Sequence, residues 1–375
     1  MTSKTIYVST IIDTFNYGTV MQAVATRDVL SAYGGPVFID YYRPQWTPEG
    51  HKAMCLERPG NPLANRLRYL ITSSNWNWQR RMFREFLERE LDLCEVGPYL
   101  EGGEFDPNAV YCVGSDQTWN FIDNEGLDPV YFLTNVSDEH KKIAFSASFG
   151  RTSLGEEEAE LTRRALAGFD AISVRESSSV AILRSLGLDG VALKDPVLLC
   201  DPGLWRRLAG GVSRATAPYV LVYRLNENES ILGYAKTLAE EMGYELRLVT
   251  FSPRQSLHAG HGIHAVMQPS PSEWLALFRD AAYVVTDSFH GTCFSLAFER
   301  PMTVFDPPQY SVRLTDVLRD FGLSDREVPC DANPESVDVH TRDVDWSSVG
   351  ALKARFACEA RDFLDGCVGE GASRD

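Results

Sequence analysis

The chain has 375 residues, which is more than one ordinary hydrophobic core holds, so the length predicts two domains. Its 36 basic and 52 acidic residues give a formal net charge of -16, which excludes a general attraction to nucleic acid. No apolar run reaches the roughly 18 residues that a membrane-spanning helix needs, and the first residues lack a signal-peptide cleavage site. The eight cysteines are scattered singly, which favours a cytoplasmic, reducing compartment.

Strands and helices alternate through the first half of the chain. We expect strands at 6–12, 36–42, 109–113, 141–148 and 171–174, with helices at 19–32, at 156–168 and from Glu176. This alternation is typical of βαβ units and a parallel sheet.

The segment 51–90 departs from this alternation and is predicted to be a helical insertion. Its aromatic residues lie among several arginines, and they are Trp76, Trp78, Phe83 and Phe86. The base rates for such helices favour an ordinary amphipathic helix with Arg/Glu pairs. The alternative is a surface helix that touches a membrane or a lipid-linked acceptor, through the region from Trp76 to Arg89.

The strand–helix pattern restarts after a segment rich in Gly, Ala and Arg at 206–218, which we interpret as an interdomain linker. Strands are expected at 219–223, 245–251, 283–286 and 302–305, and helices at 230–242, at 271–280 and from Ser288. The predicted domains are 1–205 and 219–345, followed by a helix and a disordered tail at 346–375. Both are predicted to be Rossmann-like, doubly wound α/β domains that face a cleft, where ligands bind at the carboxyl ends of the strands.

The strongest polar cluster at a strand end is VVTDSFHGTCFSLAF, residues 284–298. Backbone N–H groups at the start of the helix attract an anion, and His290 lies in the first turn. Gly291 allows close approach of the backbone, and either Asp287 or Ser288 caps the helix. A capping turn with a buried histidine and a ligand site both fit this pattern.

Two further clusters follow strands of the first half. The run YCVGSDQTWN at 111–120 holds Ser115, Asp116, Gln117 and Trp119. Ser115 and Asp116 just after a strand suit a plain turn, and Trp119 either offers a flat face to a sugar ring or fills the core. The run DTFNYGTVMQAV at 13–24 holds Asn16, Tyr17, Gly18 and Gln22, and it lacks the GxGxxG of a dinucleotide site.

The remaining clusters are SASFG at 146–150, which contains Ser148, and SVRES at 173–177. In the second, Arg175 opens a helix and either contacts a ligand or forms a surface ion pair with Glu176 or a neighbour. Each of these clusters is a weak signal alone, but five of them lie at strand ends of one chain.

In this order, the segments NYGTVMQ, VGSDQTW, SASFG, SVRE, DPVLL and TDSFHGTCFSLAFERP resemble the polysaccharide pyruvyl transferase family from Asp13 to Leu323. The segment SVRLTDVLRDFGL at 311–323 resembles its closing helix. The resemblance implies a two-domain architecture of the GT-B type. It also implies transfer of a pyruvyl group from phosphoenolpyruvate onto two hydroxyls of a sugar, giving a cyclic ketal and phosphate.

The resemblance implies that domain 1–205 is the acceptor side and domain 219–345 the donor side, and it assigns roles to individual residues. His290 is the expected proton donor and acceptor. Asp116 either orients or deprotonates an acceptor hydroxyl or forms a turn. Donor-binding residues are expected to be Arg224, Ser288, Phe289, Gly291 and Arg313. Acceptor-binding residues are expected to be Asn16, Tyr17, Gly18, Gln22, Ser115, Gln117, Trp119, Ser148 and Arg175. Some family members carry Arg where this chain has Ser288, so another cation must supply charge, first Arg224 and then Arg313 or Arg254.

This scheme requires no metal and no cofactor, with phosphoenolpyruvate as co-substrate and a saccharide, free or lipid-linked, as acceptor. The histidines of HAGHGIH, which are His258, His261 and His264, are interpreted as part of a mobile loop rather than a metal site. Two other functions compete: a GT-B-type glycosyltransferase that uses a nucleotide sugar, and a non-catalytic saccharide-binding protein. Any membrane contact is expected to be peripheral, at the inner face of the membrane.

Overall fold

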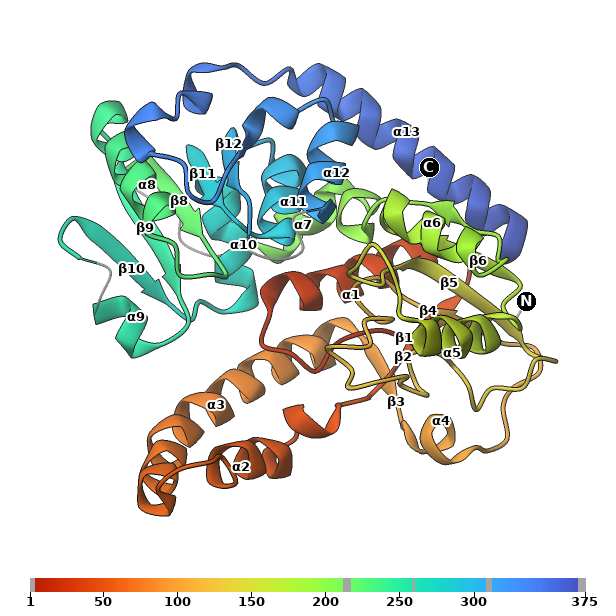
Figure 1. Ribbon diagram of the computed structural model, residues 1–375. Coiled ribbons are helices and arrows are strands. Elements are labelled where there is room, and N and C mark those ends of the chain that lie inside the picture. Colours follow the sequence, from red (N-terminus) through yellow and green to blue (C-terminus); the bar gives the residue numbers. More distant parts are fainter. Residues whose placement is uncertain (1–3, 212–216, 258–259, 308–311, 370–375) are drawn as a thin grey trace. The chain divides into compact units, whose positions relative to one another are not determined.

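The computed structural model describes residues 4–211, 217–257, 260–307 and 312–369 (Figure 1). The chain divides into two compact units. Unit 1 comprises Met1–Pro196 and Cys358–Asp375, and unit 2 comprises Val197–Ala357.

The described part of unit 1 is built on a seven-stranded parallel sheet of order β3-β2-β1-β4-β5-β6-β7. The strands are β1 Thr5–Ser9, β2 Gly35–Ile39, β3 Asp92–Cys94, β4 Val110–Val113, β5 Lys141–Ala147, β6 Ala171–Val174 and β7 Val191–Ala192. The chain runs outward from β1 to β3 and then returns to β4 on the other side of β1. The carboxyl ends of β1 and β4 therefore form a topological switch point, where open α/β sheets bind ligands.

Helices connect these strands. They are α1 Tyr17–Leu30, α2 Pro48–Leu56, α3 Pro62–Glu90, α4 Gly97–Glu101, α5 Glu156–Leu166 and α6 Ser177–Ser185. The expected insertion at 51–90 forms α2 and α3, which pack against each other and extend away from the sheet of unit 1 (Figure 1). Helix α3 begins after Asn61, whose side chain accepts a hydrogen bond from Leu63 N, and Pro62 occupies its first turn.

The described part of unit 2 repeats the design with six parallel strands of order β10-β9-β8-β11-β12-β13. The strands are β8 Tyr219–Tyr223, β9 Glu245–Thr250, β10 Ile263–Met267, β11 Tyr283–Thr286, β12 Met302–Phe305 and β13 Glu327–Val328. The helices are α7 Pro202–Leu208, α8 Glu229–Met242, α9 Pro253–Leu257, α10 Pro271–Asp280, α11 Phe289–Phe298, α12 Val312–Asp320 and α13 Trp346–Cys367. Here the switch point lies between β8 and β11.

Both faces of the unit 2 sheet are covered around its inner strand β8. Every residue of β8 is buried, as is typical of a parallel sheet with helices on both faces. Val220 and Val222 pack with the residues of α8 on one face. The ring of Tyr223 contacts Trp274 and Phe278 of α10 on the other face, at centroid distances of 5.2 and 5.7 Å. Two doubly wound α/β units, as the sequence predicted, are thus confirmed.

The structure moves the domain boundaries that we expected. Asp201 caps α7 by accepting from Gly203 N, and Trp205 is buried against Phe294 at 4.9 Å. Apolar packing therefore places the chain from Val197 onward in unit 2, ahead of the expected linker at 206–218, of which 212–216 lie outside the described residues. At the other end, α13 begins in unit 2 and ends in unit 1, and the expected disordered tail falls on 370–375, also outside the described residues.

Candidate functional site

The switch point of unit 2 brings the ends of β8 and β11 to the same level, because Tyr223 pairs with Thr286. Asp287, the residue that directly follows β11, accepts hydrogen bonds from Leu225 N at 2.7 Å and from Asn226 N at 3.0 Å. Burial raises the pKa of Asp287, and these hydrogen bonds partly oppose the rise. Asp287 therefore holds the loop after β8 against the start of α11.

Helix α11 is capped by Ser288, which settles the alternative between Asp287 and Ser288. The Ser288 hydroxyl accepts from Gly291 N at 3.2 Å, and its backbone has the extended geometry of a cap, with φ -99° and ψ 132°. The close approach that Gly291 permits is between α11 and the sheet. A Cβ atom at this position would lie 2.3 Å from Thr286 Oγ1 and 3.1 Å from Tyr223 Cδ1.

His290 lies in the first turn of α11 with only 6% of its surface exposed. Its ring meets that of Phe289 edge to face, with 5.2 Å between centroids. The guanidinium of Arg313, from the first turn of α12, lies over the ring of Phe289, 5.8 Å from its centroid. Contacts therefore join Ser288, Phe289, His290, Gly291 and Arg313 into one cluster, and these are five of the six residues expected in unit 2.

The sixth, Arg224, directly follows β8 beside the same switch point. Its Nη1 donates to Asn228 O at 2.7 Å, and Asn228 in turn caps α8 through its side chain. Arg224 is half-buried, and it lies in the same loop after β8 that Asp287 holds. Arg254, the other candidate cation, is exposed on α9.

An acidic pair that sequence reasoning did not single out follows β12. Burial, a hydrogen bond with Glu327 and the charge of that neighbouring carboxyl together raise the pKa of Asp306 to about 6. Asp306 N donates to Val328 O at 2.9 Å, which fixes the loop after β12 beside β13. The sequence gives no signal for this pair, because the two acids meet only through the pairing of β12 with β13.

The switch point of unit 1 is tied together by hydrogen bonds from α1. Asn16 caps α1 by accepting from Gly18 N at 2.9 Å, and Thr19 Oγ1 donates to Asp116 Oδ2 at 2.8 Å. The fully buried Gln22 donates to Thr10 Oγ1 at 3.0 Å. The loop after β1 and the turn after β4 are therefore joined through α1.

Asp116 has the left-handed backbone of a turn, with φ 75°, and its Oδ1 accepts from Gln117 N at 2.9 Å. The same carboxylate faces Arg175 Nη1 at 3.6 Å. Asp116 is thus a turn residue whose carboxylate is also part of a buried ionic cluster.

Arg175 is the centre of that cluster. Its guanidinium contacts Glu176 at 2.9 Å and Asp195 at 2.9 Å, in addition to Asp116. Burial alone would lower the pKa of Arg175, but the three carboxylates outweigh it and raise the pKa. Two predicted residues support the acids, since Ser115 Oγ donates to Asp195 at 3.2 Å and Ser148 Oγ donates to Glu176 at 3.0 Å.

This ion pair of Arg175 with Glu176 is buried, so our expectation of a surface pair was wrong in that respect. The acids gather around Arg175 because an isolated guanidinium cannot be removed from water without partners. Asp195 was visible in the sequence only as part of DPVLL.

The two alternatives for Trp119 are resolved in favour of the core. Its side chain is 0% exposed, its Nε1 donates to Tyr131 O at 3.0 Å, and its ring stacks near Phe132 at 5.8 Å. No face of the indole is open to a sugar. Gln117, by contrast, is half-buried, and its Oε1 accepts from Asn120 Nδ2 at 2.8 Å.

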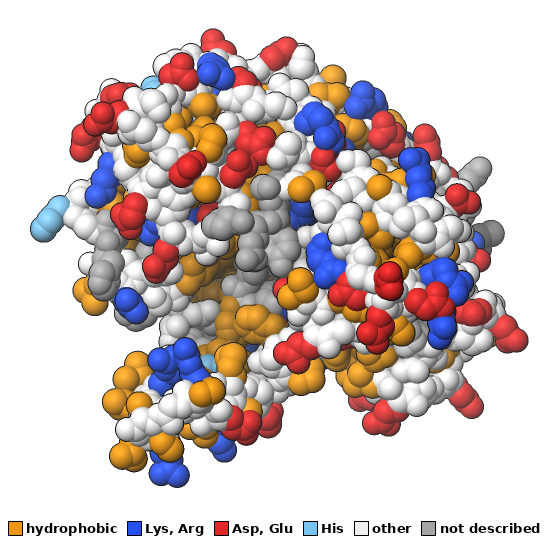
Figure 2. Space-filling view, viewed as in Figure 1, with side chains coloured by type: hydrophobic (Ala, Val, Ile, Leu, Met, Phe, Trp, Pro, Cys, Tyr) orange, Lys and Arg blue, Asp and Glu red, His pale blue; other side chains and the backbone are white. Residues whose placement is uncertain are grey.

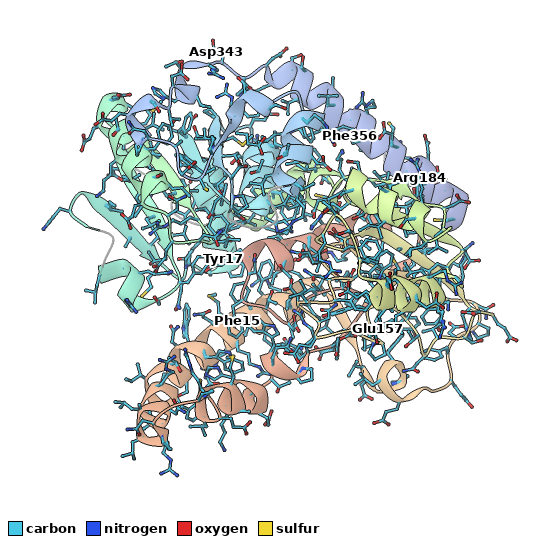
Figure 3. All side chains as sticks on the ribbon, viewed as in Figure 1. Phe15, Tyr17, Glu157, Arg184, Asp343 and Phe356 are labelled. Carbon is cyan, nitrogen blue, oxygen red and sulfur yellow. The ribbon has the colours of Figure 1, made fainter. Side chains whose placement is uncertain are left out.

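Tyr17 is also packed inside unit 1. Its ring lies 5.1 Å from that of Phe83 of α3, and the neighbouring Phe15 contacts Trp76 and Phe83 of the same helix (Figure 3). These aromatic contacts anchor α3 to the loop that precedes α1. Of the residues expected to bind the acceptor, Asn16 and Gln117 retain partial exposure, whereas the others are buried.

Sequence reasoning missed a buried ion pair beside this switch point. Arg43, after β2, binds Asp13, after β1, through two hydrogen bonds of 2.8 Å. Both residues are buried. Burial alone would lower the pKa of Arg43, but the hydrogen bonds to Asp13 and the charges of neighbouring acidic groups together raise it. The sequence pointed to one partner of this ion pair, because Asp13 opens the DTFNYG loop. It did not point to Arg43, which belongs to no recurring motif.

Two further expectations concern the histidines of HAGHGIH and contact with a membrane. Of the three histidines expected in one loop, His258 lies outside the described residues and His261 is exposed before β10. The expectation was wrong for His264, which is exposed but lies in strand β10, where it pairs with Arg247 of β9. No helix among the described residues is both long and apolar enough to cross a membrane.

The two doubly wound units, each with polar residues at its switch point, define an α/β protein with a GT-B-like fold. The chain belongs to the polysaccharide pyruvyl transferase family, whose family model matches residues 16–308. This match confirms the resemblance that the motifs indicated.

Solved structures show the same fold at low sequence identity. A putative UDP-N-acetylglucosamine 2-epimerase from Listeria monocytogenes is 12% identical, covers 100% of both chains and has a TM-score of 0.52. The UDP-GlcNAc 2-epimerase from Neisseria meningitidis, bound to UDP-GlcNAc, is 11% identical, covers 95% of this chain and 94% of its own, and has a TM-score of 0.50. No curated protein sequence gives a significant match.

Proposed function

We propose that this protein transfers a pyruvyl group from phosphoenolpyruvate onto two hydroxyls of a sugar in a polysaccharide or its precursor. The products are a cyclic ketal and inorganic phosphate. The observation that carries the proposal is the position of His290, in the first turn of α11 at the switch point of unit 2 and in one contact cluster with Arg313. Membership of the pyruvyl transferase family supports it.

The donor is an enol phosphate, and its central carbon becomes electrophilic only when the methylene carbon is protonated. An imidazole can supply that proton near neutral pH, which is the role we assign to His290. A first sugar hydroxyl then attacks, the bond to phosphate breaks, and a second hydroxyl closes the ring. Of the two protons that the hydroxyls lose, one replaces the proton given to the methylene and the other leaves on phosphate.

The donor carries a carboxylate and a phosphate, whereas the chain has a net charge of -16, so its binding needs local positive charge. We assign this charge to Arg224 and Arg313, together with the partial positive charge at the start of α11. These groups take the place of the arginine that some family members have at Ser288. Replacing either arginine with methionine should raise KM for phosphoenolpyruvate by about tenfold or more, the value of one charge-assisted hydrogen bond.

On the acceptor side we assign direct hydrogen bonds to Asn16 and Gln117, the partly exposed members of the predicted set. Asp116 orients an acceptor hydroxyl, and Arg175 holds the turn that carries it. The acceptor is a saccharide, free or lipid-linked, and the reaction is cytoplasmic.

The test is phosphate release from phosphoenolpyruvate by the purified protein with a panel of galactosides, glucosides and N-acetylmannosaminides. We expect release that depends on the acceptor, is abolished in His290→Ala and is unchanged in His264→Ala, which alters an exposed histidine of the same unit. Thermal stabilisation by UDP but not by phosphoenolpyruvate would instead favour a nucleotide-sugar transferase on this GT-B-like fold. Normal activity of His290→Ala would remove its assigned role.

A further inference from the structure

Helix α3 has two apolar faces rather than one. The inner face packs on unit 1 through its buried aromatic residues, which are Trp76, Phe83 and Phe86. In the alternative that the sequence left open, the region from Trp76 to Arg89 touches a membrane, but the indole of Trp76 is only 9% exposed and stacks on His51 at 4.7 Å. The segment from Trp76 to Arg89 is therefore mainly an anchor to the rest of unit 1.

The opposite face of α3 carries large apolar side chains in the open. Their exposed fractions are 73% for Leu63, 59% for Leu67, 67% for Leu70, 67% for Ile71 and 45% for Trp78. Spacings of four, three, one and seven residues place all five within an arc of about 100° at 100° per residue, on the side away from the buried face. A single exposed leucine is ordinary, but a continuous exposed stripe on one helix marks an interaction surface.

Positive charge accompanies this stripe. Between Pro62 and Arg84, α3 contains five arginines and no acidic residue, although the whole chain has a net charge of -16. Arg84 is paired with Asp40 and Glu88, and Arg80 lies over the ring of Tyr42. The exposed Arg66 and Arg68 flank the stripe on its two sides, and Arg81 continues it.

The hairpin of α2 and α3 displays these side chains at the edge of unit 1. Hydrophobic and basic side chains gather on it in Figure 2, at the lower left. Helix α2 adds the exposed Met54 and Lys52, but Glu49 lies in its first turn and Glu57 directly follows it, so the acid-free basic surface belongs to α3.

We propose that the outer face of α3, from Leu63 to Arg81, binds the surface of an anionic phospholipid bilayer. Helices with an apolar stripe flanked by basic residues lie in the plane of the lipid headgroups, with the stripe inserted and the charges facing the lipid phosphates. Charge complementarity selects this occupant over a second copy of the chain. A symmetric dimer through this face would place the basic face of one copy against the equally basic face of the other.

This inference is independent of pyruvyl transfer, because it rests on the surface of α3 and uses none of the residues assigned to the reaction. Its test is co-sedimentation of the full-length protein with vesicles of phosphatidylcholine alone and with vesicles of equal parts phosphatidylcholine and phosphatidylglycerol. We expect binding to the anionic vesicles only, and a weakening of that binding as salt increases.

Two sets of variants locate the surface. The triple change of Leu67, Leu70 and Ile71 to Ser should weaken binding at least tenfold, since each buried apolar side chain contributes strongly to insertion. Changing Arg66 and Arg68 to Gln should weaken it by about 25-fold, at roughly fivefold for each charge. Because all these side chains are exposed, the variants should fold like the wild type, which circular dichroism checks.

Matched controls change exposed residues elsewhere in the chain. Leu257→Ser removes an exposed leucine of unit 2, and the pair Arg184→Gln and Arg361→Gln removes two exposed charges of unit 1. These variants should bind vesicles like the wild type.

Three results would overturn the proposal. They are no binding to anionic vesicles, equal binding to neutral ones, and equal loss of binding in the control variants. Sedimentation of a dimer that the triple serine variant dissociates, without vesicle binding, would instead assign the face to a second copy.

Discussion

Replacing Gly291 with alanine tests whether the packing of α11 on its sheet positions His290. The added Cβ would lie 2.3 Å from Thr286 Oγ1, whereas an ordinary contact begins near 3.4 Å, so α11 must move by about 1 Å. Thr286 cannot turn its hydroxyl away without loss, because Oγ1 donates to Tyr223 O at 2.5 Å and accepts from Ser288 N at 3.0 Å. The neighbouring imidazole of His290 would move with the helix.

The expected change in the free energy of unfolding of Gly291→Ala is the sum of opposing effects. Forced overpacking costs about 1–3 kcal/mol, and weakening the two hydrogen bonds of Thr286 adds about 1 kcal/mol. The change from glycine to alanine inside a helix returns about 1 kcal/mol. We therefore expect Gly291→Ala to lower the free energy of unfolding by about 1–3 kcal/mol and to reduce kcat by at least tenfold.

Urea unfolding and phosphate release are the two assays. The matched control is Gly350→Ala in α13, where an added Cβ meets no atom within 4 Å, so its stability should rise by up to about 1 kcal/mol. In a Thr286→Ala background the added methyl should cost less, because the 2.3 Å contact is gone. Equal behaviour of the two glycine variants, with normal turnover in both, would refute the reasoning.

Three other predictions concern charge and capping. Arg175→Met should lower the free energy of unfolding by about 3–5 kcal/mol, because it leaves buried carboxylates without their cation, whereas Arg163→Met at the surface should change it little in the same urea titration. Asp306 binds protons more tightly in the folded state, with a pKa of about 6, so its favourable contribution is present at low pH and is lost as the pH rises through 6. Asp306→Asn should therefore be more stable than the wild type by about 1 kcal/mol near pH 8, after allowing for solvent screening, and equally stable near pH 4; the same difference at both pH values would contradict this assignment. Asn228→Ala should lower the melting temperature and cost about 1 kcal/mol, since it removes the cap of α8, and an unchanged melting temperature would count against that cap.

The sequence was sufficient to predict the fold because buried strands such as β8 and capped helices such as α8 carry local signals. The same rules placed His290 at the start of a helix after a strand. The sequence pattern could not decide whether Trp119 packs in the core or stacks on a sugar ring. An aromatic residue after a strand suits either role until the fold around it is known.

The partners of predicted residues were harder to foresee. Asp195 reaches Arg175 across 20 residues, and Asp13 reaches Arg43 across 30, through the pairing of strands rather than through local spacing. Asp287 was proposed as a helix cap, but it holds the loop after β8 because the sheet order brings that loop beside it. Such long-range contacts depend on topology, which no single motif encodes.

Helix α13 leaves unit 2 and completes unit 1, which has a consequence for how the protein is made. Leu364 is 0% exposed, Lys4 Nζ donates to Val368 O at 3.4 Å, and Tyr33 OH donates to Arg361 O at 3.3 Å. The strands of unit 1 are thus translated well before the end of α13, which covers part of their hydrophobic surface. Although domains generally fold in the order of their synthesis, unit 1 here should reach its native state only after unit 2 and α13 have been synthesised.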